Sequence, residues 1–564
     1  MKILVTGGAG YIGYFVTSKL LAMNHEVTVL DNLYYGTNSL TEFKDNKNFK
    51  FIFGDIGDLK SVMQAVKGQD AVIALAAIVG DPACNIDEDE TIKTNYLAIK
   101  HLIDVCKQYQ VKRVVFASSC SVYGDTKDAL ADEDFELSPL SLYAKTRLMC
   151  EEVLLKESEY ISPVILRLST VFGVSKRMRF DLVVNFLTAM ASQRGTFSIF
   201  GGDQWRPNVH VQDAAEAFIH AAFFPEDKLT HRVFNVGNAI NNLTINQIGD
   251  IIVKAVPNSV ALKDESNVDK RNYRVNFDRL ESVLQFDCKR TVEYGVNEVL
   301  DLLESNAIEN FESEVYNNAK YLKKNKRTVL VVAPAYNEED SIDYFFSEIK
   351  NQLEKSYNLK FIITNDGSTD STLHKLLEEK NKGTMLRIVN LAGNYGQHPA
   401  LFACLDSISD SDADYVVIID IDLQNPPKFI PRMLDQLREE NYDIVYGTRK
   451  STSLGNGLLS KIFWVLLNLF GSIYIPRDQT SLKVFNKDFL LRYKNLENRV
   501  DFFPGSLAQV PARIGYYFVS TVPRTYGNTR YDILRKIKLF AFAAKAMILK
   551  IPSKNLYKIQ KVYE

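Results

Sequence analysis

Short runs of apolar residues alternate with stretches of helical periodicity along the first half of the chain. These runs occupy residues 2–6, 26–30, 49–53, 71–75, 113–117 and 164–168. Buried parallel strands read as continuous apolar runs, because helices cover both faces of such a sheet. The pattern therefore predicts a doubly wound α/β domain of the Rossmann type, with ligands at the carboxyl ends of its strands.

A second series of apolar runs begins after residue 328 and covers 329–333, 360–364, 386–391 and 415–419. A buried first strand opens an α/β domain, so a second opening predicts a second α/β domain in series. Residues 306–327 are rich in Asn, Glu and Lys, as in a solvated helix or linker. We therefore expect domains at 1–310 and 328–564 with a linker at 311–327.

Composition narrows the class of protein. A chain of 564 residues with 46% hydrophobic content can build several domains, each with its own core. The net charge of −2 gives no global field that would attract nucleic acid. The six cysteines are scattered without a CxxC pair, and the N-terminus enters a strand directly, without a signal-peptide pattern. We therefore expect reduced thiols and a cytoplasmic protein.

Three glycines follow the first strand at the spacing GxxGxxG: Gly7, Gly10 and Gly13. Glycines there let the backbone approach a pyrophosphate at a helix N-terminus, where free N–H groups favour anions. Asp31 ends the second strand, where a carboxylate can accept hydrogen bonds from the adenosine ribose and would repel a 2′-phosphate. The sequence therefore predicts a dinucleotide site that prefers NAD over NADP.

A family resemblance is carried by several features together. They are the motif TGGAGYIG, Asp55 after a glycine, the Ala76-Ala77 turn, Asn95, the run SSCSVYG at 118–124, and Tyr143. Over residues 1–305 the chain resembles the extended short-chain dehydrogenases/reductases, in particular the NAD-dependent sugar-nucleotide epimerases and dehydratases. The resemblance implies NAD as cofactor, with Asp55 among the residues that bind it.

The resemblance also implies catalytic roles for Tyr143 and Ser119. The family spaces its Tyr and Lys as YxxxK, and the Lys position is Arg147 here. That Lys holds the nicotinamide ribose and lowers the pKa of the Tyr. Arg147 supplies the charge on a bulkier planar group, whereas Lys145 would face away on a helix. Two alternatives follow: a catalytic site rebuilt with Arg147, or a retired site.

The type of reaction is narrowed by the residues after Ser119. The family's dehydratases place Asp-Glu there, but this chain has Cys120 and Ser121, which favours epimerisation or carbonyl reduction over elimination. By the same resemblance, Arg206 in WRPNVHVQD would clamp a phosphate of the substrate. Asn185 would bind substrate in the C-terminal lobe. We expect His210 to be a packed structural histidine.

In the second half, each apolar run ends in polar residues. Glu338, Asp366, the run Asn394–Gln397, and the pair Asp420 and Asp422 follow the four runs in order. The carboxyl ends of parallel strands meet at one sheet edge, so these groups should gather there. Carboxylates at such an edge suit a divalent cation and a nucleotide diphosphate.

These strand ends resemble the family 2 glycosyltransferases of GT-A fold over residues 328–550. The sequences DIDLQNPP, NYGQ and YGTR resemble the polyprenyl-phosphate sugar synthases in particular. The resemblance implies the following roles: Glu338 and Asp366 contact uracil and ribose, Asp422 supported by Asp420 binds Mg²⁺ or Mn²⁺, Asp478 lies in the region of the catalytic base, and Arg524 closes over the diphosphate.

Membrane contact is a further expectation. The apolar stretch 462–475 is shorter than the roughly 20 residues of a spanning helix. Basic residues outnumber acids from Arg524 to Glu564 and alternate with Phe, Leu and Ile. That pattern suits a helix lying on an anionic bilayer, and the alternative is that both apolar stretches, 462–475 and 539–551, are core helices.

The sequence as a whole predicts a bifunctional enzyme of surface glycan biosynthesis. The first domain would epimerise or reduce a nucleotide sugar with bound NAD. The second would transfer a sugar, with metal and with inversion, to a lipid-phosphate or glycan acceptor on the cytoplasmic face of the membrane. The alternative keeps only the transferase active and makes the first domain a nucleotide-binding scaffold. The sugar, the acceptor and the oligomeric state stay open.

Overall fold

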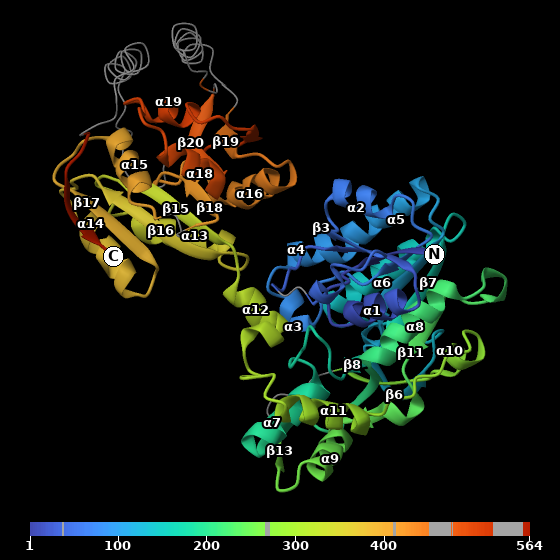
Figure 1. Cartoon of the computed structure of the whole chain (residues 1–564). Helices are drawn as coiled ribbons and strands as arrows, with labels where there is room; N and C mark the ends of the chain where they lie inside the picture. Colours follow the sequence, from blue (N-terminus) through green and yellow to red (C-terminus); the bar gives the residue numbers. More distant parts are fainter. Residues whose placement is uncertain (37–38, 265–270, 410–412, 450–474, 476–477, 523–555) are drawn as a thin grey trace. The chain divides into compact units, whose positions relative to one another are not determined.

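The computed structural model describes residues 1–36, 39–264, 271–409, 413–449, 475, 478–522 and 556–564 (Figure 1). The chain forms two compact units, Met1–Asn325 and Lys326–Glu564. The break between the units comes after Asn325, later than the boundary predicted at 310, and residues 311–325 belong to the first unit.

A seven-stranded parallel sheet in the order β11-β7-β5-β4-β1-β2-β3 forms the centre of the first unit. Its strands are β1 (Lys2–Thr6), β2 (Glu26–Asp31), β3 (Phe49–Phe53), β4 (Ala71–Ala74), β5 (Arg113–Ser119), β7 (Ser162–Leu168) and β11 (Val233–Val236). The strand order reverses between β1 and β4, where doubly wound sheets bind their ligands. The predicted Rossmann-type fold is confirmed.

Helices cover both faces of this sheet, as the apolar runs require (Figure 1). One face packs against α1 (Gly13–Ala22) and α8 (Val211–Phe223). The other packs against α2 (Leu59–Val66), α5 (Ala98–Gln108) and α6 (Leu142–Lys156). Two apolar layers result, one on each side of the sheet.

A smaller lobe at the carboxyl edge of the sheet consists of short strands and helices. Its strands form three groups: β12 (Asn242–Thr244), β10 (Trp205–His210) and β8 (Thr170–Phe172); β13 (Val260–Asp264) and β9 (Thr196–Phe200); β14 (Asn272–Val275) and β6 (Asp125–Ala131). Its main helices are α7 (Val183–Arg194), α9 (Ile245–Ala255) and α11 (Val292–Glu304). The short helices α3 (Asp81–Cys84), α4 (Glu88–Ile92), α10 (Asp278–Ser282) and α12 (Asn318–Lys324) complete the unit.

The second unit has an eight-stranded mixed sheet in the order β21-β19-β20-β18-β15-β16-β17-β22. The strands are β15 (Thr328–Ala335), β16 (Asn358–Asn365), β17 (Leu386–Leu391), β18 (Tyr415–Ile418), β19 (Ile444–Thr448), β20 (Gln479–Asn486), β21 (Ile514–Phe518) and β22 (Ile559–Tyr563). The helices are α13 (Ile342–Leu353), α14 (Thr372–Asn381), α15 (Gln397–Asp406), α16 (Ile430–Glu439), α18 (Lys487–Lys494) and α19 (Phe503–Ala508). The four strands predicted from the apolar runs, β15 to β18, lie together and parallel at its centre.

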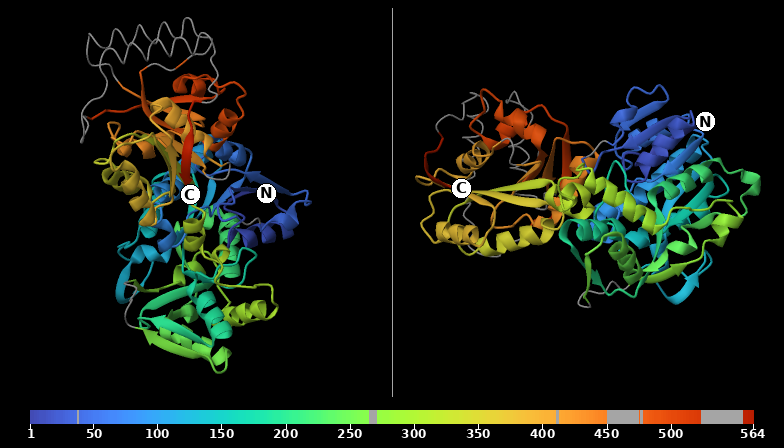
Figure 2. Two further views of the ribbon diagram at one scale, coloured as in Figure 1. Left: turned by 90° about the vertical axis from the view of Figure 1, so that its left-hand side faces the viewer. Right: turned by 60° about the horizontal axis from the view of Figure 1, so that its bottom comes forward.

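The C-terminal strand β22 pairs antiparallel with β17 at the edge of this sheet, where the chain is red in Figures 1 and 2. The prediction of a surface helix through to Glu564 is therefore wrong for these last residues. Residues 462–474 and 523–555 lie outside the described residues, and so does the predicted membrane contact. None of the helices that the structure describes is long and apolar enough to cross a membrane.

A buried ion pair links helix α6 to the sheet of the first unit. Glu151 of α6 and Arg167 of β7 are 1% and 3% exposed, and their closest atoms are 2.7 Å apart. The guanidinium also donates to the Tyr123 hydroxyl at 2.9 Å and to the Glu133 carbonyl at 3.1 Å. The Ser118 hydroxyl at the end of β5 donates to the same carboxylate. This pair therefore joins β5, β7 and α6.

Removing one partner should leave the other charge buried and unpaired. We expect Glu151→Ala to lower the free energy of unfolding by about 3–5 kcal/mol. The adjacent Glu152 is exposed, so Glu152→Ala is the matched control and should change it by less than about 0.5 kcal/mol. Denaturant unfolding of the two variants measures the difference, and equal midpoints would contradict the structural role of the pair.

Candidate active sites

The glycine-rich turn after β1 is packed too closely for any side chain. Gly7 has φ +72°, and a Cβ atom on it would lie 2.7 Å from the Ala76 backbone nitrogen. A Cβ on Gly13 would lie 2.2 Å from the Gly7 carbonyl oxygen. The turn therefore presents bare backbone at the N-terminus of α1, which is the cradle that a pyrophosphate needs.

One cavity of the first unit collects most of the predicted residues. Its lining includes Gly7, Gly10, Gly13, Asp31, Asp55, Ser119, Tyr143 and Arg147. The residues predicted to bind a dinucleotide and those predicted to be catalytic thus line the same cavity, at the carboxyl edge of the sheet. Asn185 and Arg206 are not part of this lining.

Asp31 is fixed at the end of β2 by two backbone donors. The Ala9 N–H donates to one carboxylate oxygen at 3.0 Å and the Leu33 N–H to the other at 2.8 Å. Burial raises the pKa of Asp31, and these two donors oppose the rise. Asp55 accepts from Asn32 Nδ2 at 2.6 Å and from the Gly57 N–H at 2.7 Å. With the bare glycine turn, these residues fit NAD.

Arg147 occupies the position of the family lysine and is 2% exposed, whereas Lys145 is exposed. Its guanidinium donates to the Ala117 carbonyl at 3.2 Å and to the Asn95 carbonyl at 3.3 Å, while Nε is buried without a partner in the described structure. Its Cζ atom lies 5.4 Å from the centroid of the Tyr143 ring. The charge is therefore next to the tyrosine, but two of its donors are committed to backbone.

The pKa of Tyr143 is raised above its usual value by burial, and the positive charge of Arg147 opposes that rise. A cation next to Tyr143 therefore favours its phenolate form. The Ser119 hydroxyl accepts from the Ser121 N–H at 3.2 Å and from its hydroxyl at 2.9 Å. Burial raises the pKa of Cys120 to about 12, so this thiol does not replace the acid that the dehydratases carry there.

Asn185 and Arg206, predicted to bind substrate, are bonded within the protein. Asn185 Oδ1 accepts from the Gly173 N–H at 2.9 Å, and its Nδ2 donates to the Arg179 carbonyl at 2.9 Å and the Tyr11 hydroxyl at 3.0 Å. Arg206 donates to the Trp205 and Arg271 carbonyls. Their contacts assign both side chains to the framework of the smaller lobe, and a role in substrate binding stays a prediction.

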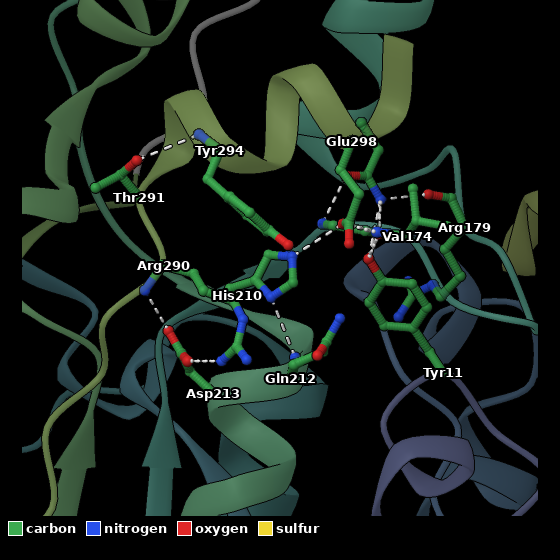
Figure 3. A network of polar contacts seen from close by, with 12 residues as sticks. Tyr11, Val174, Arg179, His210, Gln212, Asp213, Arg290, Thr291, Tyr294 and Glu298 are labelled. Carbon is green, nitrogen blue, oxygen red and sulfur yellow. Dashed lines mark hydrogen bonds and ion pairs between the residues drawn. The ribbon is translucent and has the colours of Figure 1, made fainter. Parts of the chain in front are cut away.

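His210 lies at the centre of a polar network, which Figure 3 shows from close by. It is wholly buried, and its Nε2 atom lies 3.0 Å from Glu298 Oε2. The same carboxylate oxygen accepts from the Val174 N–H at 2.8 Å, and the Gln212 N–H approaches His210 Nδ1 at 3.3 Å. Both ring nitrogens are occupied, as expected of a structural histidine.

In the second unit the strand ends converge as the sequence predicts. Asp366, after β16, accepts from the Tyr395 N–H at 2.7 Å and the Gly396 N–H at 2.8 Å, which follow β17. Burial raises the pKa of Asp366, and these donors oppose the rise. After β15, the Glu338 N–H donates to the Thr372 hydroxyl at 2.8 Å. Three neighbouring loops are thereby tied together.

The acidic pair Asp420 and Asp422 follows β18. Gln397 Nε2 donates to Asp420 at 2.9 Å, which connects the pair to the start of α15. Burial raises the pKa of Asp420, and repulsion from Asp422 adds to the rise. A divalent cation would relieve that repulsion. Within the described residues no three His, Cys, Asp or Glu side chains form a metal cluster.

Lys483 was not foreseen in the sequence, although it is close to this acidic pair. It lies in β20, is 4% exposed, and donates to the Thr480 carbonyl at 2.8 Å. Burial lowers its pKa to about 8. Asp478 lies just before β20, and its carbonyl accepts from the Arg449 N–H at 3.1 Å. Arg524 lies outside the described residues, so its predicted role stays untested.

The fold and the sites define a two-domain enzyme that joins a dinucleotide-binding unit to a sugar-transfer unit. The model of the NAD dependent epimerase/dehydratase family matches residues 3–237. The uncharacterized UDP-glucose epimerase YtcB of Bacillus subtilis is 33% identical over 252 residues, which are 42% of this chain and 77% of that protein. The first half of the chain belongs to the NAD dependent epimerase/dehydratase family.

The model of glycosyl transferase family 2 matches residues 330–497. An uncharacterized glycosyltransferase of Synechocystis is 32% identical over 219 residues, 38% of this chain and 66% of that protein. The undecaprenyl-phosphate 4-deoxy-4-formamido-L-arabinose transferase of Proteus mirabilis is 30% identical over 37% of this chain and 65% of that protein. The chain thus spans just under two thirds of these relatives, and its second unit is a family 2 glycosyltransferase domain.

The position of Asp31 generates a prediction about cofactor preference. Asp31→Ala should weaken NAD binding about 10- to 100-fold, because hydrogen bonds to a charged group are lost, and should narrow the preference over NADP. Titration calorimetry with both dinucleotides measures this. Asp45→Ala, on the exposed surface of the same unit, is the control and should leave both affinities unchanged. Tighter binding of NADP than of NAD by the unaltered protein would contradict the assignment.

Proposed function

We propose that the first unit binds NAD and epimerises a nucleotide sugar. The observation that carries the proposal is the single cavity lined by the glycine turn, Asp31, Ser119 and Tyr143. Bound NAD would supply reversible oxidation at a sugar carbon. Tyr143 would take and return the proton of the sugar hydroxyl, and Ser119 would donate a hydrogen bond to the same oxygen. The UDP-glucose epimerases among the relatives favour epimerisation over net reduction.

The test is turnover without an added reductant. Purified protein with NAD and a panel of nucleotide sugars, UDP-glucose first, should yield an epimer of unchanged mass that chromatography separates from the substrate. A reductase would instead consume NADH stoichiometrically. Formation of neither product, with NAD bound, would favour the second candidate below.

A non-catalytic nucleotide-binding scaffold is the second candidate for the first unit. The observation that favours it is the commitment of two Arg147 donors to the carbonyls of Ala117 and Asn95, which leaves less of this side chain for a ribose. The lysine of the family is a point charge with three rotatable donors, whereas the guanidinium is planar. Both candidate functions predict NAD binding, but only the epimerase predicts turnover of a nucleotide sugar.

We propose that the second unit transfers a sugar from a nucleotide diphosphate donor to a lipid-phosphate acceptor, with inversion. Support comes from the convergence of Glu338, Asp366 and the Asp420–Asp422 pair at one sheet edge. In this proposal Asp366 and Glu338 hold the nucleoside, and Asp422 with Asp420 holds Mg²⁺ or Mn²⁺ against the diphosphate. Asp478 is the proposed base. The named activity of the Proteus relative favours a polyprenyl phosphate over a glycan as acceptor.

For the first unit, Tyr143→Phe should abolish epimer formation while NAD affinity changes less than about threefold, because the phenol acts in proton transfer. Arg147→Lys should retain or raise turnover if the family mechanism applies. Lys145→Arg makes the opposite exchange at an exposed position and is the matched control. Rates by coupled assay and affinities by calorimetry separate the effects. Loss of turnover in Arg147→Lys alone would mean that the site is built around arginine.

For the second unit, Asp422→Asn should reduce sugar transfer at least about 100-fold and weaken donor binding, because the diphosphate would lose its bridging cation. EDTA should reproduce the loss in the unaltered protein, and Mg²⁺ or Mn²⁺ should reverse it. Glu497→Gln removes an exposed charge of the same unit and should have no effect. Full transfer in EDTA would refute the metal role of Asp420 and Asp422.

A further inference from the structure

The segment that joins the two units along the chain, residues 311–324, packs against the first unit. Phe311 is 6% exposed and its ring lies 5.7 Å from that of Phe180, while the Phe180 N–H donates to the Tyr316 carbonyl at 2.9 Å. Ala319 and Leu322 of α12 pack against a small apolar cluster beside Tyr143. Figure 1 shows α12 next to α3. The segment is therefore a wall of the first unit and not a solvated linker.

Asn318 is the polar centre of this wall and is 1% exposed. Its N–H donates to Asp181 at 3.0 Å, its Nδ2 donates to the Val79 carbonyl at 3.3 Å, and its Oδ1 accepts from Arg177 at 2.7 Å. The side chain thus connects the loop after β4 with the loop before α7. Its carbonyl oxygen fixes one edge of the Arg177 guanidinium.

Arg177 carries a positive charge on which Asp181 and Asp31 act electrostatically, without an ion-pair contact among the described residues. Among the described residues it forms no ion pair, whereas Arg179 is paired with Asp181 at 2.9 and 3.0 Å. The Arg177 Cζ atom lies 4.5 Å from the centroid of the Tyr35 ring, and the residue is 4% exposed. Burial and the neighbouring Arg179 lower its pKa to about 10. A buried cation in this setting is stabilised by an anionic ligand.

The cavity shows where that anion would lie. Asn318, Arg177, Arg179 and Tyr35 line the same cavity as the glycine turn. The Arg179 Cζ atom is 6.0 Å from the ring of Tyr11, which directly follows Gly10. Both arginines therefore line the cavity that also contains the bare backbone at the start of α1, where a diphosphate would be bound.

We propose that Arg177, held in place by Asn318 of the joining segment, binds the diphosphate of the dinucleotide in the first unit. Asn318 is then a positioning residue, and it is the residue through which the joining segment contributes to the cofactor site. This inference rests on the proposed binding of NAD. A diphosphate also occurs in a nucleotide sugar, so the test has to distinguish the two sources.

The experiment uses the full chain freed of nucleotide and measures the affinities of NAD, ADP, adenosine and UDP by calorimetry. Arg177→Gln should weaken NAD and ADP about 10- to 100-fold, the worth of a charge-assisted hydrogen bond, and leave adenosine unchanged. Arg177→Lys should recover part of the lost affinity, because lysine restores the positive charge but not the paired donors of the planar guanidinium. Asn318→Ala should weaken NAD and ADP about 3- to 10-fold, since the arginine keeps its charge but loses its support.

Lys324→Ala is the matched control, because Lys324 lies in the same helix with its side chain 66% exposed, and it should bind every ligand as the unaltered protein does. Thermal unfolding identifies variants that fail to fold. If Asn318→Ala fails to fold, the two Arg177 variants still test the inference. Equal NAD and ADP affinity in all folded variants would overturn the inference while NAD binding stands. Weaker UDP with unchanged ADP would assign Arg177 to the sugar nucleotide instead. No NAD binding by the unaltered protein would refute the proposed function itself.

Discussion

The buried ion pair between Glu151 and Arg167 determines where the chemistry of the first unit can take place. Desolvating two charges is costly, and their attraction compensates only when the geometry is fixed and every remaining donor is satisfied. Here the guanidinium and the carboxylate meet that condition through Tyr123, Glu133 and Ser118. The pair therefore fixes α6 relative to β5 and β7. Since α6 carries the tyrosine and the arginine, and β5 ends in Ser119, it positions the proposed catalytic groups together.

Strand polarity explains why so much of the architecture could be predicted. Parallel strands all present their carboxyl ends at one edge of their sheet. Once the strands were recognised, the polar residues that follow them could therefore be placed at that edge: Asp31 in the first unit, and Asp366 and Asp420 in the second. Strands of three residues, such as β8 and β12, are too short to show a period and were not foreseen. Burial also hides contacts from the sequence: the motif position of Asn185 does not reveal that backbone groups bond to its amide, and its predicted role in substrate binding stays a prediction.

Residues that meet only in the fold were missed for a related reason. Arg177 and Asn318 are 141 positions apart and belong to no motif, so the sequence contains no signal that couples them. Lys483 likewise reads as one charge in a strand until its burial is known. The exchange at Arg147 was visible in the sequence, but its consequence depends on which carbonyls the guanidinium reaches. That is a property of packing and not of spacing.

The joining segment shows how composition and burial can disagree. Asn, Glu and Lys are typical of solvated linkers, yet a few inward-facing side chains, Phe311, Asn318 and Leu322, are enough to fix this segment to the first unit. The charged residues of the segment face solvent and dominate its composition, whereas the buried residues stabilise its packing against the first unit. A domain boundary drawn from composition therefore falls before this segment, and one drawn from contacts falls after it. If Asn318 supports the cofactor site, the segment that leads along the chain to the second unit also helps to form the NAD site of the first.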